Sequence, residues 1–509
     1  MSTNSMQEML ITLPGATSDV VYVESVRGRE ALSNAYEFEA DVVCRNPLQI
    51  EPMLGKAAKL ELRVLDEEAV VHGIVAAVMT LDPTTNREFC YRFVIAPELA
   101  LMKLSRQNQI YGTDRDMNVV DIVEKELSDG NKSGSKTASS RVGRSIPHQI
   151  LADKSSYPKL DFTMQYNESD FDFISRLCEK FGIFYMFDQS GDQEVVQFCD
   201  RKEHFRRVAG RKLTEELPFR SESQIRSQGD FAIRSFKGTF KVAAGSIHRR
   251  EFNDETPTVD LSVSHYAAYS GQGIDVRYGE NYRTVGEGNF LATRRMEQVS
   301  AERQTFAGES NIPLLRPGMI FKLVDHPIAE LEAYYVITQV EHEMAEPTPL
   351  GFSSADKKSE PYRNRFTCIP FTIQYRPPLS TPKPVVNGFL IGFVDGEGSS
   401  KRAELDQYGR YRIRIMDEES GLSGGKASYL VRKAEPYGGG DGFGSHSTLN
   451  VGTEVILGFL HGDPDRPIIM GAFSNAHLSN PVTQTNSNVA HRTRTASGII
   501  LQMCDGAAR

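Results

Sequence analysis

The stretch FLHGDPDRPIIMGAF, residues 459–473, places four ionisable side chains between two apolar runs: His461, Asp463, Asp465 and Arg466. The flanking runs TEVILGFL and PIIMGAF are nearly continuously apolar, which is typical of strands buried on both faces. Asp463-Pro464-Asp465 is strong turn chemistry, because proline presets φ and aspartate side chains accept hydrogen bonds from nearby amides. The stretch therefore predicts a hairpin turn. A metal site would need further carboxylates or histidines, and the sequence nominates none.

The region around this turn has the pattern of a small barrel. Upstream, Pro377–Gly388 contains four prolines, which indicates a stiff linker, placed at residues 381–387. Five short strands are expected within residues 388–475, and their number and spacing favour an OB-type barrel: GFLIGFVDG, GRYRIRIMD, SYLVRKAEP, TEVILGFLHG and PIIMGAF. Residues 476–509 are rich in Thr, Ser and Asn and have too few apolar residues for a core. This tail is either disordered or strand material that folds only against other chains.

Residues 1–380 combine many strands with a few helices. Between Ser18 and Ala100, stretches rich in Val, Tyr, Phe and Ile predict strands of a barrel or sandwich: VVYVESV, YEFEADVV, KLELRVL and FCYRFVIA. The pattern returns from Phe231 to Pro377 in FAIRSFKGTFKV, MIFKLVDHP, YYVITQVEHEM and FTCIPFTIQYRP. Leu291–Gln304 is expected to form a helix that is charged on one face. The fold class is therefore mainly β with a few helices.

Two further helical segments lie between these groups of strands. Asp116–Leu127 has helical apolar spacing, and the polar run at 129–145 predicts a surface loop. In SDFDFISRLCEKFG, Ser169 or Asp170 can cap a helix that Gly182 ends, followed by a hairpin of IFYMF and EVVQFC that turns around residues 190–192. The apolar stripe of this helix is predicted to be core rather than a cofactor pocket: Phe171, Ile174, Leu177, Cys178 and Phe181.

Composition narrows the class of protein. The chain has 509 residues, enough for two to four domains, and 58 Lys+Arg against 67 Asp+Glu give a net charge of −9. That charge argues against nonspecific nucleic-acid binding. The six cysteines contain no CxxC pair and predict reduced, mostly buried thiols, as suits folding in the cytoplasm. The N-terminus lacks the pattern of a cleaved signal peptide, and the most apolar stretch, Ala69–Met79, is far shorter than the about 20 residues that span a bilayer.

Candidate catalytic groups are few. His446 could act as a base with Asp463, and Ser445 or Ser447 could be the nucleophile, but adjacency in sequence does not establish geometry. No P-loop, dinucleotide fingerprint or HExxH motif is present. His204 and His326 are isolated and are predicted to be ordinary polar residues. The sequence thus predicts no catalytic, cofactor-binding or metal-binding residues.

The strand GRYRIRI offers a candidate nucleic-acid surface. Arg410, Arg412 and Arg414 share one face of it, opposite Tyr411, Ile413 and Ile415. OB barrels bind oligonucleotides through such strands, usually with aromatic side chains on which bases stack. No aromatic residue alternates with these arginines. The pattern favours a half-solvated strand whose arginines meet carboxylates.

Five blocks, in order, resemble VgrG, the spike protein family of bacterial type VI secretion, which is similar to the hub and spike of tailed-phage baseplates. The blocks are QYNESDFDFISRLCEKFGIFYMF, LRPGMIFKLVDHP, YRNRFTCIPFTIQYRPP, AELDQYGRYRIRI and VGTEVILGFLHGDPDRPIIMGAFSN. The resemblance covers most of residues 10–500, and GDPDRPI followed by Gly and Asn is close to a family signature.

The resemblance implies a phage-hub-like domain of barrel-like subdomains at 1–380, an OB domain at 388–475 and the start of a trimeric β-helix needle at 476–509. It implies a homotrimer that caps a hexameric Hcp-type tube, contacts baseplate proteins, carries a PAAR-type tip protein or an effector, and punctures a target membrane. It implies no cofactor and no nucleic-acid partner. Assembly in the cytoplasm followed by ejection through sheath contraction would need no signal peptide.

The chain departs from the family pattern at three places. Tyr429 stands where a Trp is usual, and Leu449-Asn450 replaces a common Pro-Arg pair. The sequence ends at Arg509, where the family's needle begins, which predicts a short or truncated needle.

Three alternatives remain open at this point. A contractile phage tail or an extracellular injection particle would use the same parts. A hydrolase effector would use the region of His446 and Asp463, although the linker has no room for a lysozyme-like insert. A separate OB module would bind single-stranded nucleic acid or sugar.

Overall fold

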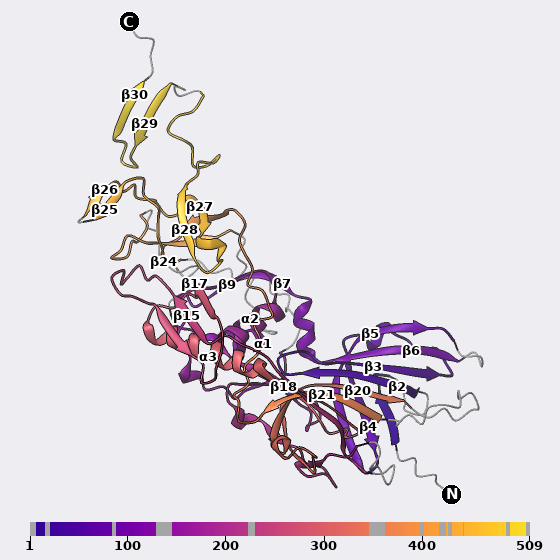
Figure 1. Cartoon of the computed structure of the whole chain (residues 1–509). Coiled ribbons are helices and arrows are strands. Elements are labelled where there is room, and N and C mark those ends of the chain that lie inside the picture. The colour runs from indigo at the N-terminus through magenta and orange to yellow at the C-terminus, as the bar shows by residue number, and fades with distance from the viewer. Residues whose placement is uncertain are drawn as a thin grey trace.

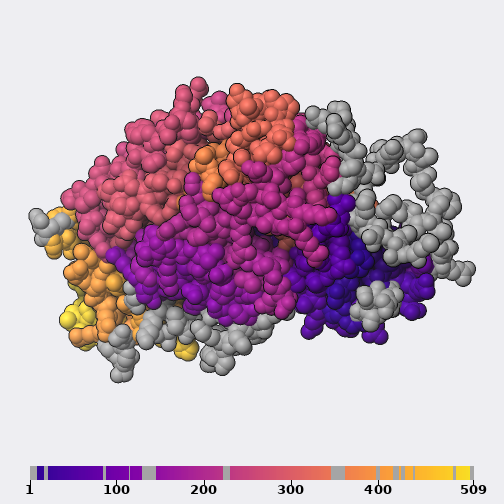
Figure 2. Space-filling view, turned by 90° about the horizontal axis from the view of Figure 1, so that it is seen from below, coloured from indigo at the N-terminus to yellow at the C-terminus, as the bar shows by residue number. Residues whose placement is uncertain are grey.

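The computed structural model describes residues 7–15, 21–83, 88–113, 115–128, 145–221, 230–345, 362–396, 402–416, 424–425, 430–440, 442–484 and 489–504. It has three successive parts, here called the body (β1 to β21), the barrel (β22 to β24, β27 and β28) and the C-terminal hairpin (β29 and β30). They follow one another along an elongated chain, with the C-terminal hairpin far from the strands of the N-terminus (Figures 1 and 2). The loop predicted at 129–145 lies outside the described residues except for Ser145.

The body is built on one large, mostly antiparallel sheet, in the order β1-β4-β5-β6-β3-β2-β20-β21-β18-β14, with β19 beside β20. Its strands are β1 (Gln7–Thr12), β2 (Val21–Ala31), β3 (Glu37–Cys44), β4 (Ala57–Val64), β5 (Glu67–Leu81), β6 (Phe89–Ala96), β12 (Arg206–Arg207), β13 (Glu216–Pro218), β14 (Ile233–Phe240), β18 (Gln304–Ser310), β19 (Met319–Val324), β20 (Tyr334–Ala345) and β21 (Tyr362–Pro370). β2 and β20 join two halves that enclose separate cores, one under β1–β6 and one under β14 and β18–β21. The predicted strands are confirmed, and β5 contains the most apolar stretch.

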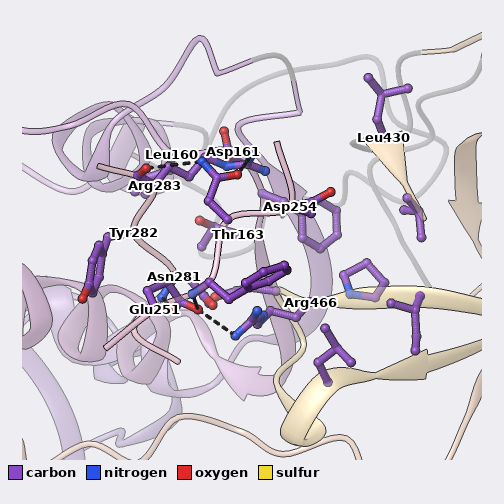
Figure 3. Close-up of a pocket in the computed structure, with 18 of the residues that line it drawn as sticks. Leu160, Asp161, Thr163, Glu251, Asp254, Asn281, Tyr282, Arg283, Leu430 and Arg466 are labelled. Carbon is purple, nitrogen blue, oxygen red and sulfur yellow. Dashed lines mark hydrogen bonds and ion pairs between the residues drawn. The ribbon is translucent and has the colours of Figure 1, made fainter. Parts of the chain in front are cut away.

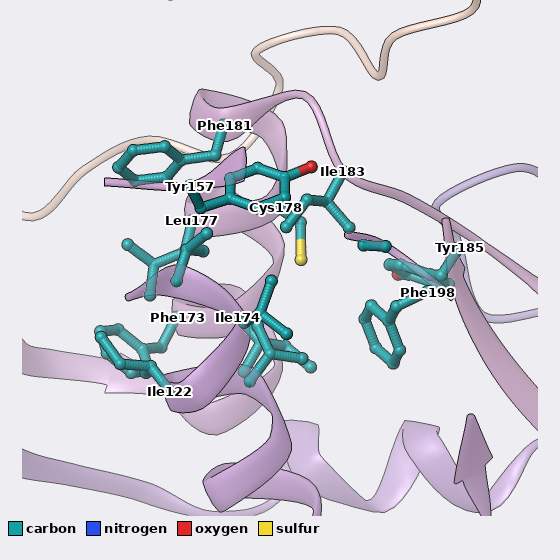
Figure 4. Close-up of a cluster of buried hydrophobic side chains, with 14 of the residues drawn as sticks. Ile122, Tyr157, Phe173, Ile174, Leu177, Cys178, Phe181, Ile183, Tyr185 and Phe198 are labelled. Atoms are coloured by element: carbon teal, nitrogen blue, oxygen red, sulfur yellow. The ribbon is translucent and has the colours of Figure 1, made fainter. Parts of the chain in front are cut away.

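A helical layer is inserted between the strands of the body. Its elements are α1 (Val119–Ser128), α2 (Asp170–Phe181), β7 (Arg106–Tyr111), β8 (His148–Ile150), β9 (Thr163–Ser169), β10 (Phe184–Asp188) and β11 (Val195–Cys199). The Ser169 hydroxyl accepts a hydrogen bond from Asp172 N at 3.0 Å, and Gly182 ends α2 with φ of 73°, as predicted. The apolar stripe of α2 is buried against β10 and β11 (Figure 4).

The longest helix packs on a small sheet. α3 (Val285–Arg303) covers β15 (Ser246–Arg250) and β16 (Val263–Tyr266), and β17 (Ile274–Tyr278) lies at the sheet edge. α3 begins before the predicted Leu291 because Thr284 caps it, which the weak helix formers Gly286 and Gly288 obscure in the sequence.

The barrel has the five strands predicted. They are β22 (Leu390–Val394), β23 (Tyr411–Ile415), β24 (Leu430–Val431), β27 (Glu454–Phe459) and β28 (Pro467–Ala472), in the order β24-β23-β22-β27-β28. A parallel bridge between Lys433 and Ile469 closes the sheet on itself. A small hairpin that the sequence did not predict projects from it, made of β25 (Gly438–Gly440) and β26 (Phe443–Gly444).

The C-terminal hairpin pairs β29 (Ala490–Arg494) with β30 (Ile500–Cys504). Leu501 is 70% exposed and Met503 is 67% exposed. Part of the tail is therefore strand material, and in a single chain its apolar side chains face solvent.

Two expectations about the whole chain can be compared with these parts. All six cysteines are free, and Cys44, Cys178, Cys199 and Cys368 are buried, as predicted. In the described ranges, no helix combines the length and the apolar character needed to cross a membrane.

Candidate functional site

The stretch HGDPDR forms the turn between β27 and β28. Asp463 N donates to Leu460 O at 3.1 Å, and Arg466 N donates to Asp463 O at 2.9 Å. Asp465 N donates to the Asp463 carboxylate at 2.9 Å, which is the aspartate turn chemistry that the sequence predicted. The hairpin-turn prediction is confirmed.

The carboxylates of this turn also hold the barrel to the body. Asp465 accepts a hydrogen bond from Met164 N of β9 at 2.7 Å, and Asp463 accepts one from the Asn281 amide at 2.8 Å. The Lys383 ammonium, from the proline-rich segment, lies 2.5 Å from Asp463 and 2.6 Å from Asp465. One turn therefore ties together three segments that are distant in sequence.

Lys383, Asp463 and Asp465 are here called the clamp, and their opposite charges stabilise one another. Burial opposes ionisation of Asp463 most strongly, yet the Lys383 ammonium and the hydrogen bonds to the carboxylate hold the pKa of Asp463 below its ordinary value. Burial likewise opposes the charge of Lys383, but Asp465 and Asp463 raise the pKa of Lys383. Asp463 and Lys383 therefore stay ionised at neutral pH.

The region where the barrel meets the body is here called the joint. A second set of contacts lies in the joint beside β17. Arg466 pairs with Glu251 at 3.2 Å (Figure 3). The Arg466 guanidinium also lies 6.0 Å from the centre of the Tyr278 ring. The same ring meets His461 edge to face at 5.5 Å. Because the Glu251 side chain is only 2% exposed, its pairing with Arg466 is needed to offset the loss of hydration.

Arg410 makes a third connection. It is 5% exposed, and it pairs with Asp406 of the barrel at 2.7 Å and Glu255 of the body at 2.8 Å. The expectation that these arginines meet carboxylates is confirmed for Arg410, while Arg414 lies over the Phe393 ring at 5.7 Å. The sequence did not indicate that Arg410 is buried between two parts of the chain.

Apolar side chains seal the same joint. Three residues of the body share one hydrophobic cluster with the barrel core: Ile110, Phe162 and Met164. They pack with buried barrel residues that include Val394, Tyr411, Leu457 and Ile469. β7 and β9 thus cover one end of the barrel, and the two parts have no independent cores at this end.

A cavity of about 180 Å³ remains at the joint (Figure 3). Several of the charged residues in its lining are engaged in pairs, such as Arg283 with Asp161 and Arg466 with Glu251. Over the described residues, no group of three His, Cys, Asp or Glu side chains is arranged to hold a metal ion. The charged groups named here are therefore engaged in contacts within the chain.

The residues considered for catalysis do not come together. His446 contacts Glu435 at 2.7 Å and the Tyr411 hydroxyl at 3.2 Å, whereas Asp463 is engaged by Lys383 and Asn281. His446 and Asp463 therefore have different partners, and the hypothesis that they pair with each other is wrong.

The two isolated histidines also have ordinary surroundings. His326 packs edge to face on Phe219 at 4.6 Å, and His204 lies 4.0 Å from Asp200. Neither is part of a cluster that could hold a metal ion among the described residues.

Comparison with known families now adds to this geometry. Residues 29–348 match the family described as phage tail baseplate hub (GPD). The chain belongs to the phage tail baseplate hub family. Residues 405–473 match a second family, the type VI secretion system/phage-baseplate injector OB domain, which contains the turn at the joint. The resemblance inferred from the sequence is confirmed.

Several curated relatives of this hub protein are named spike proteins. It is 28% identical over 471 residues to the type VI secretion system spike protein VgrG5 of Pseudomonas aeruginosa, covering 88% of this chain and 55% of the relative. VgrG4b of the same organism is 28% identical over 494 residues, covering 93% and 56%. The chain spans about half the length of the curated relatives it matches.

Solved structures show the same fold. The E. coli c3393 protein, a type VI secretion component described as similar to the T4 bacteriophage tail proteins gp27 and gp5, aligns with a TM-score of 0.63 at 24% identity, covering 91% of this chain and 99% of that one. A chain of the Francisella PdpA-VgrG complex aligns with a TM-score of 0.60 at 9% identity, covering 98% and 83%.

Proposed function

We propose that this chain is the structural hub and spike base of a contractile injection machine, most specifically of the type VI secretion class. In this proposal residues 1–380 are the hub, 381–387 the linker, 388–475 the OB domain and 476–509 the start of the needle. The observation that carries the proposal is the joint, where Asp463, Asp465 and Arg466 fix the barrel to the body. A rigid connection of this kind suits a protein that passes axial force from a tube to a tip.

The proposed assembly is a homotrimer. The C-terminal hairpin leaves apolar side chains exposed, and an isolated two-stranded hairpin is marginally stable in water. Three copies wound around one axis would cover those side chains and pair the free strand edges. The hub would cap an Hcp-type tube and contact baseplate proteins, and the needle would carry a PAAR-type tip protein or an effector.

The proposed role is mechanical and not enzymatic, with no catalytic residue, cofactor, metal or nucleic acid. The trimer would assemble in the bacterial cytoplasm, leave the cell when the sheath contracts, and puncture the target membrane. A contractile phage tail or an extracellular injection particle is the alternative setting for the same parts.

The test is co-assembly with an Hcp-type tube protein. Negative-stain images of the mixed proteins should show three-fold particles that cap the ends of hexameric tubes. Particles that remain separate from the tubes, together with hydrolysis of purified cell wall by this chain alone, would overturn the proposal in favour of the hydrolase alternative.

A further inference from the structure

A second cavity, of about 410 Å³, lies in the body beside the joint. It is enclosed by α2, α3, the end of β17 and residues 379–383. Seven cationic side chains line it: Arg176, Lys180, Arg249, Arg277, Arg294, Arg295 and Lys383. Only two carboxylates do so, Glu179 and Glu280, although the chain as a whole carries a net charge of −9.

Six of the seven cations have a carboxylate partner within ion-pair distance. The pairs are Arg176 with Glu168, Arg249 with Asp275 and Glu280, Arg277 with Asp275, Arg294 with Glu297, Arg295 with Asp275, and Lys383 with Asp463 and Asp465. Lys180 differs from the others. Its ammonium donates to the carbonyl of Glu280 at 2.7 Å, and no carboxylate of the described chain lies within ion-pair distance of it.

The surroundings of Lys180 disfavour its charge. Burial, and next the charge of Lys383, lower the pKa of Lys180. A partly buried cation without a counter-ion costs free energy that a nearby anion would recover. The α2 C-terminus and the Glu280 carbonyl offset part of this cost, but each carries only a partial charge.

Arg294 of α3 also lines this cavity. The Arg294 Nε atom is buried and has no hydrogen-bond partner among the described residues. Arg294 lies beside Gly182, the residue that ends α2 shortly after Lys180. A Cβ added to Gly182 would lie only 3.0 Å from Arg294 Cδ. Lys180 of α2 and Arg294 of α3 therefore both line a cavity that has room for a small ligand, and the Arg294 guanidinium is already paired with Glu297.

We propose that this cavity binds a small oxyanion, of the phosphate or carboxylate class, beside the Lys180 ammonium and among the other cations of its lining. The oxyanion would neutralise the one unpaired cation and join α2, α3 and the proline-rich segment next to the joint. Its source is either free solution or a carboxylate of another copy of this chain. This site is independent of the proposed mechanical role and would exist in the hub whatever machine it serves.

Thermal unfolding tests the proposal. Sodium phosphate is compared with sodium chloride at equal ionic strength, and the unfolding midpoint of the wild-type chain should rise with phosphate by about 2 °C or more and then saturate. Lys180→Met should abolish this response and should unfold at a higher temperature than wild type without phosphate, because an uncompensated charge is gone. Lys241→Met, at an exposed lysine, is the matched control and should respond as wild type does.

Phosphorus NMR gives a second readout, in which wild-type protein should broaden the phosphate line and Lys180→Gln should not. If phosphate acts only on the dissociated chain at low protein concentration, the site is an oxyanion site filled by another copy. Equal responses to phosphate and chloride at every protein concentration, or a wild-type phosphate response in both Lys180 variants, would overturn the proposal.

Discussion

The joint and the C-terminal hairpin differ in whether their side chains find partners within the same chain. At the joint, charged side chains are partly or fully buried and have partners from other segments of the same chain, as in the contacts of Asp465 with Met164 and Lys383. In the hairpin, β29 and β30 pair only with each other, and Leu501 and Met503 stay exposed. The comparison teaches which contacts one chain can complete and which are left for other copies.

This difference in partners follows from where each region lies relative to the rest of the fold. The joint closes over segments that the large sheet and the helices of the body already hold in place, so little further entropy is lost when the barrel docks. The hairpin extends beyond every layer of the fold and has nothing of its own chain to pack on. Changes at the joint should therefore alter the stability of a single chain, and changes in the hairpin should alter only its assembly.

The largest effect is expected where a buried pair loses one member. Arg176 and Glu168 have side chains that are 6% and 7% exposed, and Arg176 also donates to Met164 O, next to the clamp. Arg176→Met leaves the Glu168 carboxylate buried without its cation and should lower the free energy of unfolding by about 3–5 kcal/mol. Urea unfolding measures the loss.

The double variant Arg176→Met, Glu168→Gln is the control for that change. It removes both charges and should recover most of the lost stability, because an uncharged pair of similar volume has little desolvation cost. A double variant as unstable as the single one would show that packing, and not the buried charge, carries the effect.

A smaller effect is expected at the clamp itself. Lys383→Met leaves Asp463 and Asp465 together without their cation and should lower the stability of the barrel against the body by about 2 kcal/mol. Faster proteolysis within residues 377–388 would report the loosened joint. Lys237→Met, at an exposed lysine of β14, is the matched control and should cleave at the wild-type rate.

The clamp also predicts a pH dependence. Because the pKa of Asp463 is lowered in the folded chain, its contribution to stability is present above its ordinary pKa near 3.8 and is lost as the pH falls through the lower folded value. Asp463→Asn should be less stable than wild type at pH 7, and the difference should shrink below about pH 4. A difference that stays constant down to pH 2 would contradict the assigned ion pair.

The smallest effect on folding is expected in the hairpin. Leu501→Asp and Met503→Asp change exposed side chains and should alter the unfolding free energy of the body and barrel by less than about 0.5 kcal/mol. Thermal unfolding of each variant at low protein concentration checks this. A loss as large as that of Lys383→Met would place the hairpin within the cooperative unit of the single chain.

Much of the fold is encoded locally and could be predicted. Ser169 and Gly182 mark the ends of α2, and Asp463-Pro464-Asp465 marks the turn between β27 and β28, because capping and turn chemistry act over a few residues. The family blocks then supply the order of the parts.

The long-range part of the site could not be predicted in the same way. The acceptor of the Met164 amide is Asp465, 301 residues further along the chain, and no periodicity links them. Arg410 sits at an alternating position of a strand and looks solvated in sequence, yet Glu255 of the body buries it. The turn at Asp463-Pro464-Asp465 has two carboxylates, although turn chemistry needs only one. This excess was the one indication of a further role, and it did not identify the partners of the two aspartates.

The mass of the purified chain in solution, measured by light scattering on a sizing column, tests the central claim most directly. One chain has a mass of 56.8 kDa. The account predicts three times this mass for the wild type and a single-chain mass for the double variant Leu501→Asp, Met503→Asp, with unchanged unfolding of the body and barrel. A wild-type chain that stays monomeric at every concentration, or a double variant that remains trimeric, would contradict the claim that the hairpin is completed by other copies.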